Sequence, residues 1–212
     1  MSDLEAILIG LLRKIGRTVT RTELVKILFL FECTYYKLYG RSFTGVQFVR
    51  HNYGPHCEEV IQAAHRLERA GLVNTWHTPN YFGGLTYYYC LTDAGARPAT
   101  KVAPEEERLI TYIAGLTKPL SLELTKRIAY SMPPMMEILR EEAVAGYKVI
   151  GRRLNMDKMR PSVEKKPISR LKKAFAEIDL APRGTDQEYS ETILNEWREL
   201  QPYRQKAEQC KA

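Results

Sequence analysis

Positive charge is missing from a long stretch of this chain, although the protein as a whole is basic. Residues 71–96 contain no lysine or arginine, while the complete sequence of 212 residues carries a formal net charge of +7. Most of the excess lies between Lys148 and Lys173, where ten basic residues accompany only Asp157 and Glu164, a local charge of +8. The basic character therefore belongs to one segment and not to the fold as a whole.

Long apolar runs are missing too. A membrane-spanning helix needs about 18 consecutive apolar residues, whereas the longest candidate here is the short run from Ala6 to Leu12. The chain begins Met-Ser-Asp-Leu-Glu, without the basic start that a secretory signal has. We therefore expect a cytoplasmic protein that has no membrane partner.

The sequence also lacks the motifs that would carry catalysis. Its four cysteines are far apart and form no CxxC pair, which favours reduced thiols over disulfides. No P-loop, GxGxxG, GxSxG or HExxH motif occurs. His51 and His56 lie near Cys57, but His56 and Cys57 are adjacent and would point about 100° apart on a helix. We therefore expect no enzymatic activity, no metal site and no cofactor.

Two helices are predicted at the start of the chain. Apolar residues recur at helical spacing over residues 4–15, and the pattern stops before Gly16. Thr20 and Glu23 form a capping-box sequence, in which each side chain accepts a hydrogen bond from the other residue's backbone N–H. The helix that follows, to about Tyr39, is apolar nearly all round. This pattern predicts a buried helix at the centre of the core.

A third helix and a β-hairpin are predicted next. Pro55 suits the first position of a helix, which would run to about Ala70. Residues 72–77 and 85–91 are rich in aromatic and β-branched residues, and a glycine-containing loop joins them. A cap and a short helical turn follow at residues 91–95. This order is typical of a winged helix, so residues 1–98 are predicted to be a winged-helix-like part.

The rest of the chain is predicted to be helical. Pro104 with three carboxylates opens one helix, Ser121 caps a second, and a third ends near Ala145. The fold class is therefore mainly α with a small β-hairpin. We expect one domain over residues 1–150, in which a helical part (99–150) follows the winged-helix-like part. Residues 151–212 would form a basic linker and a helical C-terminal extension.

Charge indicates what the predicted winged helix would bind. A wing that meets DNA needs cations for the phosphates, but this wing has none, and the helix behind it starts near Glu58 and Glu59. The wing instead carries tyrosines, which are enriched in protein interfaces, although burial of these rings within the chain is about as good an interpretation. We predict a partner-binding surface made of Tyr53, Tyr81, Phe82 and Tyr87.

The basic segment keeps nucleic acid as an alternative partner. Paired cations could bind phosphates without sequence preference, although most charge runs are solvated linkers. The residues concerned are Arg152, Arg153, Lys165, Lys166, Lys172 and Lys173.

One stretch of the sequence resembles a known family. Residues 26–45, KILFLFECTYYKLYGRSFTG, resemble the "KLLYLAD…YGRPITG" pattern of the Panacea (SocA-like) antitoxin domain. Tyr53-Gly54-Pro55 matches the family's YGP turn, and the helix end LERAGLV follows it. Residues 131–137, SMPPMME, look like a degenerate form of the family's H-x-x-x-P-W region and lack its His and Trp. The resemblance covers about residues 4–145.

The resemblance implies an antitoxin that neutralises a cognate protein toxin by direct binding, and some members of the family act as adaptors for proteolysis. Members pair with unrelated toxins, so neither the toxin nor the oligomeric state follows from the sequence. The alternative is a winged-helix DNA-binding transcriptional regulator that uses the basic segment.

Overall fold

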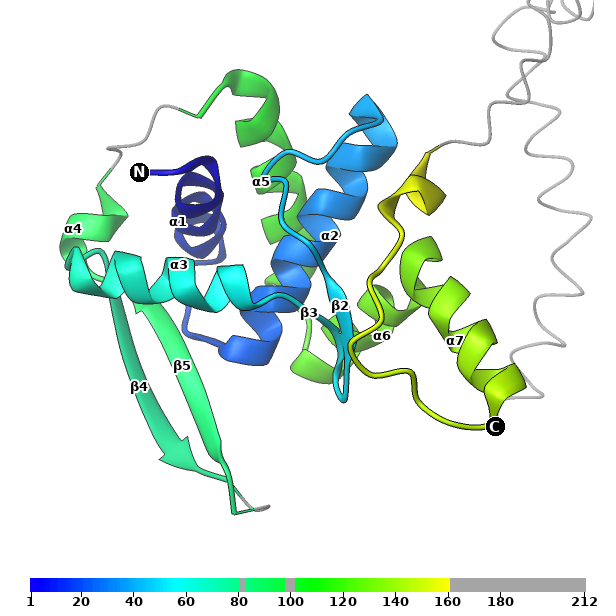
Figure 1. The fold of residues 1–212 in the computed structure, drawn as a ribbon. Coiled ribbons are helices and arrows are strands. Elements are labelled where there is room, and N and C mark those ends of the chain that lie inside the picture. The colour runs from blue at the N-terminus through cyan, green and yellow to red at the C-terminus, as the bar shows by residue number, and fades with distance from the viewer. Residues whose placement is uncertain (81–82, 98–101, 161–212) are drawn as a thin grey trace, which may run out of the picture. The chain divides into compact units, whose positions relative to one another are not determined.

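The computed structural model describes residues 1–80, 83–97 and 102–160. The chain divides into two units, Met1–Pro161 and Ser162–Ala212, and all the described residues belong to the first. In this part of the chain the fold is mainly helical, as the sequence predicts (Figure 1). It contains two small antiparallel sheets, whereas the sequence predicts a single hairpin. None of the described helices is long and apolar enough to cross a membrane.

The helices are α1 (Asp3–Ile15), α2 (Arg21–Tyr39), α3 (Glu58–Arg69), α4 (Asp93–Ala96), α5 (Pro104–Thr117), α6 (Leu122–Ser131), α7 (Pro133–Ala145) and the 3-10 helix η1 (Met156–Met159). The strands are β1 (Val19–Thr20), β2 (Val49–His51), β3 (Gly54–His56), β4 (Val73–Pro79) and β5 (Leu85–Leu91).

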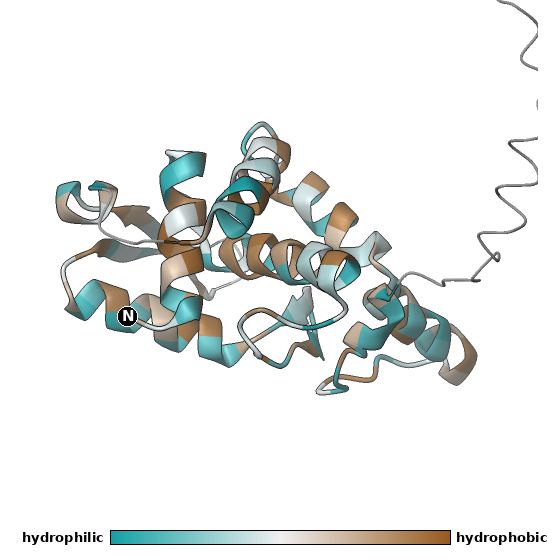
Figure 2. Ribbon diagram, turned by 90° about the horizontal axis from the view of Figure 1, so that it is seen from above, coloured by the Kyte–Doolittle hydropathy of each residue, from teal (hydrophilic) through white to brown (hydrophobic). Residues whose placement is uncertain are grey.

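Helix α2 is the centre of the core. The predicted capping box is present, because the Thr20 hydroxyl accepts from the Glu23 backbone N–H and the Glu23 carboxylate accepts from that of Thr20. Gly40 ends the helix in the left-handed conformation, with φ of 69°. Helices α3, α5, α6 and η1 all contact α2. Apolar residues accordingly dominate α2 in Figure 2, whereas hydrophilic residues interrupt the outer helices.

The predicted hairpin is confirmed and forms the larger sheet. Strands β4 and β5 pair from Val73 opposite Leu91 to the far end of the hairpin, and the short strand β1 pairs with β5, giving the order β1-β5-β4. On one face the rings of Trp76 and Tyr88 stack with centroids 5.5 Å apart. Tyr89 is buried in the core. At least part of the tyrosine cluster therefore packs within this chain.

The predicted helix start at Pro55 is wrong. Pro55 lies in strand β3 opposite Arg50 of β2, and helix α3 begins three residues later, at Glu58. The fixed φ of proline suits the first turn of a helix and an edge strand alike. Tertiary contact decides between them here, because the Pro55 carbonyl accepts a hydrogen bond from the Lys26 ammonium, 2.5 Å away.

Part of the expected linker packs on the body of the first unit. The Arg50 backbone N–H donates to the Arg152 carbonyl, and the Gly151 N–H donates to the Arg50 carbonyl, both at 2.7 Å. Leu154 and Met159 are buried. Residues 151–159 therefore complete the edge beside β2. The domain boundary at residue 150 stays a prediction, and the helices expected in the C-terminal extension lie outside the described residues.

A buried carboxylate fixes the loop that follows α2. Glu32 is 1% exposed, and its two oxygens accept hydrogen bonds from the Phe43 and Thr44 backbone N–H groups and from the Ser42 and Thr44 hydroxyls, at 2.7 to 3.1 Å. Four donors offset the cost of burying the charge. The loop of residues 41–45 is therefore tied to the core.

Replacing Glu32 with glutamine should destabilise the protein by about 2–4 kcal/mol, because an amide group presents its own donors to this cluster of donors. Urea unfolding measures the loss. The control is Glu107→Gln on α5, where the half-exposed glutamate side chain forms a salt bridge with Lys14. This substitution should lower the free energy of unfolding by less than about 1 kcal/mol. Equal small losses in the two variants would contradict the structural role given to Glu32.

Candidate functional site

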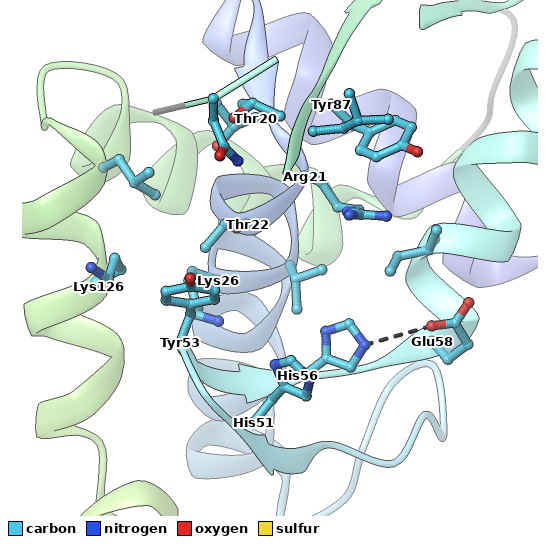
Figure 3. A pocket seen from close by; sticks show the side chains of 16 residues that line it. Thr20, Arg21, Thr22, Lys26, His51, Tyr53, His56, Glu58, Tyr87 and Lys126 are labelled. Atoms are coloured by element: carbon cyan, nitrogen blue, oxygen red, sulfur yellow. Dashed lines mark ion pairs between the residues drawn. The ribbon is translucent and has the colours of Figure 1, made fainter. Parts of the chain in front are cut away.

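A cleft of about 680 Å³ lies where five elements meet. Its walls come from the start of α2, the β2–β3 hairpin, the start of α3, the β4–β5 hairpin and the start of α6 (Figure 3). The polar and aromatic residues that line it are Thr20, Arg21, Thr22, Lys26, His51, Tyr53, His56, Glu58, Asn80, Thr86, Tyr87 and Lys126. The cleft is therefore built from segments that are far apart in the sequence.

Lys26 lies at the base of the cleft. Its side chain is only 2% exposed and donates to the Pro55 carbonyl, so it joins α2 to strand β3. Burial lowers the pKa of Lys26 to about 7, with smaller contributions from the positive charges of Lys126 and Arg50. No carboxylate near enough to form a salt bridge with Lys26 occurs in the described part of the chain.

Two histidines lie beside Lys26. The rings of His51 and His56 have centroids 5.0 Å apart, and His56 Nε2 lies 3.5 Å from a carboxylate oxygen of Glu58. Burial lowers the pKa of His56, and the positive charge of His51 lowers it further, while Glu58 opposes both effects. No group of three metal-ligating side chains gathers here or elsewhere among the described residues.

Two partly exposed cations, Arg21 and Lys126, lie on opposite sides of the cleft (Figure 3). Arg21 begins α2, and its guanidinium lies over the Tyr87 ring, 4.2 Å from the centroid. It forms no salt bridge with any residue that the structure describes. Lys126, on α6, forms a salt bridge of 2.9 Å with Glu123 one turn earlier.

A buried ion pair orients the β2–β3 hairpin. Arg50 Nε and Nη2 donate to the two carboxylate oxygens of Glu142 on α7, at 2.8 and 3.1 Å. At the turn of the same hairpin, a Cβ on Gly54 would lie 2.6 Å from the Tyr130 ring, and Gly54 has φ of +93°. Only glycine combines this backbone conformation with such close packing. The Tyr-Gly-Pro turn is therefore held against α6 and α7.

Comparison with known proteins identifies the scaffold of this cleft. Residues 24–121 match the family model described as antitoxin SocA-like, Panacea domain. The resemblance seen in the sequence is thus confirmed. No curated protein and no solved structure matches the chain.

The two polar ends of the Panacea pattern have a structural explanation here. Lys26 corresponds to the lysine that begins the KLLYLAD pattern, and it holds the YGP turn through its hydrogen bond to Pro55. Glu32 corresponds to the aspartate that ends this pattern, and it holds the Tyr-Gly-Arg-Ser-Phe-Thr-Gly loop. Both side chains are buried. In this chain the pattern therefore specifies a scaffold rather than a contact surface.

Two of the four predicted partner-binding residues lie at the cleft. Tyr53 is 59% exposed at the turn of the β2–β3 hairpin, and Tyr87 lines the opposite wall beneath Arg21. Tyr81 and Phe82 lie outside the described residues. The sequence analysis missed Arg21 and Lys126, because nothing in the pattern joins residues so far apart.

The predicted nucleic-acid-binding residues do not line this cleft where they are described. Arg152 lies 3.6 Å from Glu141, and the Arg153 backbone pairs with Val49. The other four, Lys165, Lys166, Lys172 and Lys173, lie outside the described residues. Their role in phosphate binding stays a prediction.

Replacing Lys26 with methionine should remove a pH-dependent part of the stability. The pKa of Lys26 is about 7 in the folded protein, against about 10.4 for a lysine in an unfolded chain. Between these values the unfolded chain binds more protons, so the free energy of unfolding rises with pH from about 7 upward. Between about pH 6.5 and about pH 8.5 the wild type should gain about 1–2 kcal/mol relative to the variant.

Urea unfolding at the two pH values gives this difference, and subtraction of the variant removes the contributions of the histidines and cysteines. Lys37→Met, an exposed position near the other end of α2, should follow the wild type. Parallel stability profiles for wild type and Lys26→Met would show that burial does not perturb Lys26.

Proposed function

We propose that this protein is an antitoxin that neutralises a partner toxin by binding it directly. The observation that supports this most is the match of residues 24–121 to the SocA-like Panacea domain. The cleft adds a surface suited to a protein partner, because it combines exposed tyrosine with arginine, two residue types enriched at protein interfaces.

We further propose that residues 1–98 form a winged-helix-like part. The order of elements is α1, β1, α2, β2, β3, α3, β4, β5, and the small strand β1 pairs with β5, the last strand of the β4–β5 hairpin. In such an arrangement α3 would approach DNA and β4–β5 would be the wing. Here α3 begins with Glu58 and Glu59, and the hairpin carries no cation. This charge distribution favours a protein over DNA as the partner of this face.

A DNA-binding regulator is the second candidate. The observation that favours it is the local charge of +8 between Lys148 and Lys173. Duplex DNA should then bind with an affinity that falls steeply with salt concentration. Loss of this affinity when Lys165, Lys166, Lys172 and Lys173 become glutamine would support this candidate.

Co-expression with each neighbouring reading frame tests the antitoxin proposal. One neighbour should arrest growth when expressed alone, and this protein should restore growth and co-purify with it as a stable complex. Restored growth without a complex would point to repression of the toxin gene. The absence of any toxic neighbour would contradict the proposal.

The extension beyond the Panacea match is proposed to help select the toxin. A chain that ends at Pro161 keeps every described element, including the segment paired with β2, so it should fold. We expect this shortened protein to unfold cooperatively in a thermal melt monitored by circular dichroism, yet to lose growth rescue. Full rescue by the shortened protein would mean that residues 162–212 play no part in toxin binding.

A further inference from the structure

We propose that the cleft at the start of α2 receives an acidic segment of the partner toxin. This inference rests on the proposed antitoxin function and specifies the chemistry of the partner at one site. The occupant would be an extended stretch of chain that carries Asp or Glu side chains, together with at least one apolar side chain.

The charges of the lining residues support an anionic occupant. Arg21 and Lys126 contribute positive charge, and Lys26 adds to it when it is protonated. Among the described residues that line the cleft, Glu58 is the one acidic residue. Glu58 already lies beside His56, and Lys126 is partly neutralised by Glu123 from outside the cleft. Arg21 has only the face of Tyr87 as its partner in the described part of the chain. An incoming carboxylate would therefore find a cation without an ionic partner.

The surroundings strengthen that attraction. Charges at a concave, partly buried surface interact more strongly than charges in open water. Burial is the main cause of the lowered pKa of Lys26, and the positive charges of Lys126 and Arg50 lower it further. Carboxylates bound at Arg21 and at Lys126 would bring negative charge to this surface.

The mouth of the cleft favours a polypeptide. Tyr53 and Leu85 are 59% and 44% exposed, and they come from the two hairpins on either side. An aromatic and an aliphatic side chain beside cations suit a segment that alternates acidic and apolar residues. The volume of about 680 Å³ accommodates a few side chains, since pockets of this class hold ligands of similar size.

Nucleic acid fits the same cleft less well. A phosphate backbone requires a row of cations along its path, but the wall formed by β4–β5 has none, and Glu58 stands at the start of α3. The two accessible cations, Arg21 and Lys126, lie on opposite sides and do not form a row. The cleft thus offers two separate contacts for carboxylates.

These two cations lie just outside the family match, which covers residues 24–121. The matched span supplies the base of the cleft through Lys26 and both hairpins. Arg21 and Lys126 flank it on either side in the sequence. We therefore assign the charge of the cleft to recognition of this protein's own toxin, and not to the scaffold.

Charge-neutralising variants of the full-length protein test the proposal. The double variant Arg21→Gln/Lys126→Gln should bind the toxin found by co-expression at least about tenfold more weakly than the wild type does. The affinity of the wild type should also fall more steeply with salt concentration than that of the variant. The control is Lys37→Gln with Arg69→Gln, which removes two exposed cations at the opposite ends of α2 and α3. Thermal melts should show that both double variants remain folded.

Photo-crosslinking locates the occupant directly. With p-benzoylphenylalanine in place of Tyr53, the toxin should crosslink through a peptide of net negative charge, identified by mass spectrometry. The same group in place of Tyr112, which is exposed on α5 and does not line the cleft, should give no crosslink to that peptide. A crosslink from Tyr53 to a basic or purely apolar toxin segment would overturn the proposal.

The outcomes separate this inference from the antitoxin function. Growth rescue and toxin affinity that are unchanged in Arg21→Gln/Lys126→Gln would overturn the cleft proposal while the antitoxin function stands. If no neighbouring frame is toxic, the antitoxin function fails. A fluorescent peptide rich in Asp and Glu then tests the cleft alone, with a Lys-rich peptide and a single-stranded DNA oligonucleotide for comparison. Preference for the DNA would overturn the acidic-segment proposal, and preference for the acidic peptide, lost in the double variant, would support it.

Discussion

The hydrogen bond from the Lys26 ammonium to the Pro55 carbonyl joins the core of the molecule to the surface on which the cleft is built. Helix α2 is buried on almost every side, so a polar side chain in its second turn is costly unless it is hydrogen-bonded. The bond holds β3 against α2, and strand pairing then positions β2. From β2, the ion pair between Arg50 and Glu142 extends the constraint to α7. One buried amine thus determines where the β2–β3 hairpin lies relative to the other walls.

Glu32 plays the corresponding role two turns further along the same helix. Its carboxylate accepts hydrogen bonds from residues 42–44 and so fixes the segment that leads from α2 into the β2–β3 hairpin. Both side chains are buried polar groups that would be destabilising without their hydrogen-bond partners. Together they explain why an otherwise apolar helix carries a lysine and a glutamate at the two polar positions of the Panacea pattern. The pattern is readable in sequence because these contacts constrain residue type, whereas exposed contact residues leave no comparable trace.

Elements with strong local signals could be predicted from the sequence. The capping box at Thr20, the helix it begins and the hairpin of residues 73–91 all follow from periodicity and turn chemistry, and the structure contains them. The failures have a tertiary cause. Pro55 enters a strand because Lys26 and Arg50 hold it there, and residues 151–159 pack because β2 offers them an edge. The cleft could be predicted only in part, through Tyr53 and Tyr87. Arg21 and Lys126 are far apart in the sequence, and only the folded chain brings both to the same cleft.

The division between scaffold and contact residues bears on the partner choice that we propose for the cleft. Arg21 occupies the first turn of α2, but the cap of that helix is made by Thr20 and Glu23, so the stability of the helix start does not depend on the Arg21 side chain. Lys126 lies on a partly exposed face of α6, while Ala129 of the same helix packs in the core. Substitution at either cation would change the charge of the cleft without disturbing Lys26, Glu32 or the ion pair of Arg50. The residues that specify the fold are therefore separable from those to which we assign partner choice.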